Sequence, residues 1–251
     1  MTRVKIRDYS ALVDRIKSSA SGHALRTLGQ IAAGGASYPM FKIVLGKDNP
    51  MKILISAGIH GDEPAGIEAV LEFLESQRYL KFSQQWEITL VPCLNPWGYE
   101  YGVRENHKSK DLNREFKSIS PPQEIKLIQS VLDDPFDLAL ELHEDDGSSG
   151  FYLYGKGVCE KEEEWAEQLI GAVEPVMPVN TNVFVEGGKM HQGIVLEECG
   201  SRKKARWPMA LYTRLHGTPL CLTLETSMKF PMEVRTEAHL RAIETALKIY
   251  K

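Results

Sequence analysis

The feature that most constrains this chain is a regular alternation between strand-like and helix-like segments. Lys52–Ala57 is a short, largely apolar run typical of a buried strand, and Pro64–Gln77 places its apolar residues on one helical face. The same unit recurs along the chain, with strands at 86–92, 136–142 and 220–224 and helices at 122–132, 160–173 and 233–250. Such alternation predicts an α/β fold, with a mostly parallel sheet flanked by helices.

The segments before Lys52 predict an N-terminal addition to this sheet. A helix over residues 8–18 precedes two β-like runs, Ala24–Ala32 and Tyr38–Leu45, which we expect to form an edge hairpin. The chain has 251 residues, a length at which one hydrophobic core can still grow without splitting. We therefore expect a single domain over residues 1–251.

Composition excludes several classes of protein. Hydrophobic residues make up 43% of the chain and its net charge is −4, which favours a packed core and argues against nucleic acid as a partner. The sequence has no apolar run of about 18 residues and no apolar signal-peptide core, so we expect neither a membrane span nor export. The four scattered cysteines form no C-x-x-C pair, which argues against a sulfur metal site and favours a cytoplasmic protein.

Two polar residues follow the strand Lys52–Ala57 at a spacing suited to a metal. His60 and Glu63 lie three residues apart at the expected strand-to-helix turn, so an imidazole and a carboxylate can converge on one ion. His143 directly follows the strand over 136–142, and the carboxyl ends of parallel strands meet at one edge. Two histidines and one glutamate form a known catalytic zinc set, which predicts one zinc ion per chain. Each signal alone is more often structural, and no comparable companion set surrounds the remaining histidines, which are His23, His107, His191, His216 and His239.

The segment Asn95–Ser120 shows little regular pattern and is long for a connection, which in a compact domain favours a functional loop. It carries Arg104 and Arg114 close to the predicted metal site. A guanidinium there can bind a carboxylate through two hydrogen bonds or stabilise an oxyanion. Taken singly, each arginine is better explained as a solvated surface charge.

Five motifs in order resemble those of the zinc carboxypeptidase family, which includes the more distant succinylglutamate desuccinylase and aspartoacylase enzymes. They are H-G-D-E at 60–63, N-P-x-G at 95–98 followed by Arg104, D-L-N-R-x-F at 111–116, Leu142-His143, and Thr223-Leu-Glu225. The likeness spans about residues 38–250. It implies a mixed, roughly eight-stranded sheet sandwiched between helices, in a single zinc-hydrolase catalytic domain.

The resemblance also implies a role for each matching residue. His60, Glu63 and His143 would hold the zinc ion, and Glu225 would act as general base. Arg104 would polarise the scissile carbonyl.

The substrate-binding residues implied by the resemblance are Asn113 and Arg114, which would bind the terminal carboxylate of the substrate. The carboxypeptidases also carry a tyrosine some twenty residues before the general base, where this chain has Lys203. Tyr212 is the nearest tyrosine upstream of Glu225 and is our candidate, with Tyr152 and Tyr154 as alternatives.

Three functions compete on this evidence. The first is a carboxypeptidase that removes a C-terminal residue, and the second is a deacylase acting on a small N-acyl amino acid; both require a substrate with a free carboxylate. Aspartoacylase-like enzymes add a β-rich C-terminal domain, whereas the 26 residues after Glu225 predict one helix, so we expect an open cleft and peptide substrates. The third is a metal-free binding module. The preferred side chain of the substrate's terminal residue stays open. The basic run Ser201–Arg206 would favour an acidic residue there, whereas the acidic pair Asp145 and Asp146 would favour a basic one.

Overall fold

The fold is built around one mixed sheet. The computed structural model describes residues 4–156, 160–185, 188–197 and 205–250. The strands are β1 (Ala24–Ala33), β2 (Ala36–Leu45), β3 (Met51–Ala57), β4 (Trp86–Val91), β5 (Leu138–Asp145), β6 (Tyr152–Lys156), β7 (Phe184–Val185), β8 (Gly188–His191), β9 (Ile194–Glu197) and β10 (Leu220–Ser227). They lie in the order β1-β2-β4-β3-β5-β10-β6-β9-β8-β7, and β4, β3, β5 and β10 run parallel to one another.

The predicted α/β fold and the edge hairpin of β1 and β2 are confirmed, but the expected number of strands is wrong. The described sheet has ten strands rather than eight. The strands β7, β8 and β9 have only two to four residues each, too few for an alternating pattern to show in the sequence. The prediction of a single domain over 1–251 stays a prediction.

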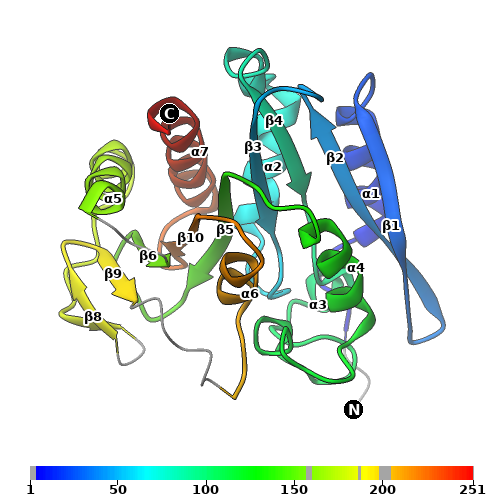
Figure 1. Cartoon of the computed structure of the whole chain (residues 1–251). Helices are drawn as coiled ribbons and strands as arrows, with labels where there is room; N and C mark the ends of the chain where they lie inside the picture. The colour runs from blue at the N-terminus through cyan, green and yellow to red at the C-terminus, as the bar shows by residue number, and fades with distance from the viewer. Residues whose placement is uncertain (1–3, 157–159, 186–187, 198–204, 251) are drawn as a thin grey trace.

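Helices cover the sheet on both sides (Figure 1). The α-helices are α1 (Tyr9–Ser19), α2 (Ala65–Glu75), α3 (Pro96–Tyr101), α4 (Gln123–Leu132), α5 (Glu160–Val173), α6 (Met209–Leu215) and α7 (Met232–Ile249), and two 3₁₀ turns lie at η1 (Arg78–Lys81) and η2 (Leu112–Arg114). Helices α1, α2, α7 and α5 pack in that sequence, each against the next, and α6 contacts β5, β10 and β6. No helix in the described ranges is long and apolar enough to cross a bilayer.

Two short helices lie where the sequence predicts no regular structure. Helix α3 begins inside the segment expected to be irregular, because the Asn95 side chain caps it by accepting a hydrogen bond from the Gly98 N–H at 2.9 Å. Helix α6 buries Met209, Ala210 and Leu211 against the sheet, a pattern too short for its period to be recognised.

Candidate metal centre and active site

The site forms where three neighbouring parallel strands end. β3 pairs with β5, and β5 pairs with β10, so the segments that follow them meet at one edge of the sheet. β5 and β10 both continue past the predicted ends at 142 and 224, to Asp145 and Ser227. His143 and Glu225 therefore lie within strands and are paired in register, which places both side chains on the same face.

Glycines bring two of the motif segments into contact beside this edge. A Cβ atom on Gly61 would lie only 1.9 Å from the backbone of Gly98, so a larger residue cannot be accommodated at this approach. The Gly61 N–H also donates to the carbonyl oxygen of Arg104. The turn that carries His60 is thereby fixed against the segment that carries Arg104.

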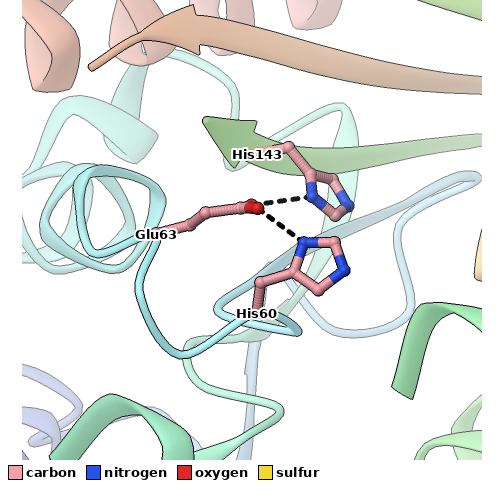
Figure 2. A group of neighbouring side chains, drawn as sticks. All are labelled: His60, Glu63 and His143. Atoms are coloured by element: carbon pink, nitrogen blue, oxygen red, sulfur yellow. Dashed lines mark hydrogen bonds and ion pairs between the residues drawn. The ribbon is translucent and has the colours of Figure 1, made fainter. Parts of the chain in front are cut away.

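His60, Glu63 and His143 converge as the sequence predicted (Figure 2). One oxygen of Glu63 lies 2.6 Å from His60 Nδ1, and the other lies 2.8 Å from His143 Nδ1. One ligand atom from each residue can be chosen so that all three lie within 4.8 Å of one another. Each residue is only 3% exposed. Two imidazole nitrogens and a carboxylate oxygen at this spacing match the donor set of a catalytic zinc site.

The electrostatics of the cluster couple its three members. Burial alone would raise the pKa of Glu63, but the two histidines hold that pKa well below its usual range. Burial would lower the pKa of His143, yet the Glu63 carboxylate and the nearby Glu141 raise it well above 6.5. The Glu144 backbone N–H donates a further hydrogen bond of 3.1 Å to Glu63. The cluster is thus a site prepared for a cation, in which the carboxylate is kept ionised.

Glu144 links this cluster to the helices on the other face of the sheet. Its carboxylate accepts a hydrogen bond from the Ala65 N–H at the start of α2 and forms an ion pair with Arg235 of α7. Its side chain is buried, as is the Ala65 backbone. Because Ala65 lies two residues after Glu63, this contact fixes the segment that presents Glu63 to the histidines.

A second carboxylate, Asp111, connects the metal cluster to Arg104. Asp111 Oδ1 lies 3.3 Å from His60 Nε2, and Arg104 donates two hydrogen bonds of 3.2 Å to Asp111 Oδ2. Burial opposes ionisation, but His60 and Arg104 hold the pKa of Asp111 well below its usual range. Arg104 also approaches Glu63 at 3.4 Å. The sequence did not single out Asp111, although it opens the D-L-N-R motif.

The predicted carboxylate-binding residues follow on η2. Arg114 faces the cleft and donates one hydrogen bond of 2.9 Å to the carbonyl oxygen of Asn113. The Asn113 side chain is almost buried, and its Oδ1 accepts a 2.8 Å hydrogen bond from the Met209 N–H. Its Nδ2 lies 3.4 Å from His143 Nε2. Arg114 is therefore better placed than Asn113 to meet a substrate.

These side chains line one cleft of about 500 Å³, a volume typical of small-ligand sites. Besides the metal cluster it contains Glu225, Arg104 and Arg114. Arg206 also lines it and lies 3.7 Å from Glu115. Residues 201–204 of the basic run, which include Lys203, lie outside the described residues.

The structure places different tyrosines in the cleft from the one predicted. Tyr212 is not among the described lining residues; its ring stacks on His216 with centroids 3.8 Å apart. Tyr152 and Tyr154 of β6 do line the cleft, because β6 pairs with β10 and Tyr152 lies opposite Glu225. Tyr212 faces elsewhere because α6 directs that position toward Phe116.

Tyr152 is firmly held beside the candidate base. Its hydroxyl donates a 2.8 Å hydrogen bond to Asp145, which ends β5. Burial, together with the charge of Glu225, raises the pKa of Tyr152 well above 10. This hydroxyl therefore stays protonated at neutral pH and can donate its hydrogen bond to Asp145.

Residues 49–189 match the catalytic domain of the succinylglutamate desuccinylase/aspartoacylase family, more than half of the chain. The chain belongs to this family. The resemblance drawn from the five motifs is confirmed, and the family indicates a hydrolase. No curated protein matches the sequence significantly.

Solved structures with this fold share little sequence with our desuccinylase/aspartoacylase-family protein. A candidate metallopeptidase from Shewanella amazonensis SB2B is 21% identical, with a TM-score of 0.84 over 96% of this chain and 93% of that one. A metallo-carboxypeptidase from Burkholderia cenocepacia is 16% identical, with a TM-score of 0.72 over 98% and 70%. A metallo-carboxypeptidase from Pseudomonas aeruginosa, in complex with (2-guanidinoethylmercapto)succinic acid, is 16% identical, with a TM-score of 0.68 over 96% and 68%. At these identities the likeness shows a shared fold.

Proposed function

We propose that this protein is a zinc-dependent hydrolase that cleaves the C-terminal amide bond of a peptide bearing a free carboxylate. The observation that carries the proposal is the joint presence, in one cleft, of the buried His60–Glu63–His143 cluster, Glu225 and Arg114. A metal site, a carboxylate base and a guanidinium are the parts that such a reaction requires.

The donor set fits zinc. His60 and His143 would offer Nδ1, because these are the nitrogens that face Glu63, and Glu63 would offer a carboxylate oxygen. The chemistry that zinc supplies in such a site is a bound water with a pKa near 7 and polarisation of a carbonyl oxygen.

The protein's own residues would divide the remaining work. The Glu225 carboxylate accepts a proton from the attacking water and returns it to the departing amine nitrogen. Arg114 binds the substrate carboxylate and so fixes the scissile bond relative to His60, Glu63 and His143. Arg104, which lies 3.4 Å from Glu63, directs its guanidinium to the carbonyl oxygen as negative charge develops there.

A second candidate is an N-acyl amino acid deacylase with the same residues in the same roles. The family match favours it, because succinylglutamate and acylated aspartate are the substrates for which that family is named. The metallo-carboxypeptidases of the same fold favour the peptidase. The two readings differ in what lies on the far side of the scissile bond, a peptide or a small acyl group.

Substrate comparison on the zinc-loaded enzyme tests both. We expect tripeptides with a free C-terminus to be cleaved, and the same tripeptides with an amidated C-terminus to be cleaved poorly. Efficient hydrolysis of acetyl-aspartate or succinyl-glutamate, with no cleavage of peptides of three or more residues, would replace the peptidase by the deacylase. Equal cleavage of free and amidated peptides would eliminate carboxylate recognition from both proposals.

A further inference from the structure

Glu141 is a buried carboxylate that the proposed reaction does not use. It lies two residues before His143 on β5, so both side chains point to the same face of the sheet. Its side chain is 4% exposed, and its Oε2 lies 3.9 Å from His143 Nε2. Its Oε1 is buried and has no hydrogen-bond partner among the described residues. Burying a polar oxygen without a partner costs free energy of folding, so this side chain requires an explanation.

The surroundings of Glu141 offer little compensation. It borders a small cavity, lined in part by Ile59, Leu94 and Met209, that is too small to hold a water molecule. Within the described ranges, its one ion pair is with His143. The explanation for Glu141 must therefore lie at His143.

Two side chains of the described residues contact His143 Nε2, those of Asn113 and Glu141. When Nδ1 binds a metal, the imidazole proton resides on Nε2 and needs an acceptor. Asn113 lies 3.4 Å away but presents Nδ2, because its Oδ1 is occupied by the Met209 N–H. An amide NH₂ donates and cannot accept. Glu141 is the other of these two neighbours, and its carboxylate is an acceptor.

His60 provides a parallel within the same cluster. Its Nδ1 also faces Glu63, and its Nε2 lies 3.3 Å from the Asp111 carboxylate. Both histidines thus present one nitrogen to the cluster and the other to a carboxylate. The two carboxylates differ in their setting, since the Asp111 side chain is 21% exposed and that of Glu141 only 4%.

We propose that Glu141 is a positioning residue that accepts the Nε2 proton of His143 and thereby keeps Nδ1 directed at the metal. The inference rests on the proposed function, because it requires His143 to be a metal ligand. The present separation exceeds a hydrogen bond, and a displacement of about 1 Å or less would form one. Partners of this kind typically contribute about 10–100-fold to metal affinity.

Zinc affinity and the stability of the metal-free protein, measured on the same variants, test the proposal. We expect Glu141→Leu to bind zinc about 10–100-fold more weakly in competition with a chelator. Glu141→Gln should lose less, because its amide keeps one acceptor oxygen. Without metal, Glu141→Leu should unfold at the same or a higher temperature than the wild type, because the unsatisfied buried oxygen is gone.

Glu100→Gln provides a matched control at a second buried carboxylate. Glu100 accepts a 2.6 Å hydrogen bond from Tyr38 and pairs with Lys5 at 2.9 Å, so its replacement should lower stability and leave zinc affinity unchanged. If Glu141 served the fold alone, its variants would behave like this control, and the proposal would be overturned. The proposal would also be overturned if both Glu141 variants bound zinc as tightly as the wild type. That result would leave the proposed function intact. A wild type that binds no zinc would instead remove the proposed function, and this inference with it.

Discussion

The metal cluster and the arginines of the cleft differ in how firmly the fold holds them. His60, Glu63 and His143 are each 3% exposed and are bound to one another within a sheet edge. The Arg104 side chain is 38% exposed and that of Arg206 is 60% exposed, and both project from irregular segments. The sheet edge and the tight turn beside it therefore hold the metal cluster, whereas the arginines lie on more exposed, irregular segments, where binding residues of a rigid scaffold are commonly found.

The largest effect should follow from removing a residue of the buried cluster. His143→Ala removes one of the three proposed metal donors and one of the two histidines that contact Glu63. We expect zinc content to fall to background and activity to be lost, as measured by metal analysis and peptide hydrolysis. His191→Ala, which changes an exposed histidine on β8, is the control and should retain both. A full complement of zinc in His143→Ala would remove that residue from the metal site.

Glu225→Gln should separate metal binding from catalysis. The substitution keeps the shape of the side chain but removes the base, which typically contributes about 10²–10⁴-fold to the rate. We expect zinc content and thermal stability to stay close to those of the wild type while kcat falls by that factor. Turnover near the wild-type rate would show that another group takes the proton.

Arg114→Ala tests the arginines of the cleft rather than the buried metal cluster. Losing one partner of a desolvated charge pair commonly costs about 2–5 kcal/mol, so kcat/KM for a free peptide should fall roughly 30-fold or more. Zinc should remain bound, because Arg114 donates to the Asn113 backbone and not to the metal cluster. Arg114→Lys should recover only part of the loss, since lysine lacks the planar fork.

The control for this prediction is Arg241→Ala, which removes an exposed arginine of α7 that pairs with Glu237. It should leave kcat/KM unchanged. If Arg114→Ala also cleaved free peptides at the wild-type rate, carboxylate recognition would have to be reassigned, and Arg206 would become the candidate because it lines the same cleft.

Much of the buried half of the site could be predicted from the sequence. The apolar strands mark where the sheet ends, and polar residues directly after such strands meet at its carboxyl edge. His60, Glu63 and His143 could therefore be brought together before the structure was known. The strand bounds could not, because the polar residues His143–Asp145 interrupt the apolar pattern while β5 continues through them.

The other residues of the site are placed by tertiary contacts, which leave no periodic pattern in the sequence. Asp111 acts through its distance to His60, and Glu141 through its distance to His143; one lies 51 residues from its partner and the other only two. The tyrosines of the cleft follow from the pairing of β6 with β10, which spacing from Glu225 does not reveal. Tyr212 has the nearest spacing and still faces Phe116.

The smallest expected effect concerns the stability of the buried region and its dependence on pH. His239 of α7 is fully buried, its Nε2 lies 3.2 Å from Thr226 Oγ1, and burial lowers its pKa from 6.5 to about 3. Below pH 6.5 the unfolded chain binds a proton at this position that the folded chain does not, so folding stability decreases as the pH falls toward 3. Between pH 7 and pH 5 the loss of folding stability from this residue amounts to about 2 kcal/mol.

His239→Gln cannot take up the proton, so denaturant unfolding of the metal-free variant should show a pH dependence smaller by that amount. His216→Gln, which alters an exposed histidine, should keep the wild-type dependence. If the pH dependence of stability were the same in His239→Gln as in the wild type, the folded protein would protonate the buried His239 ring as readily as the unfolded chain does.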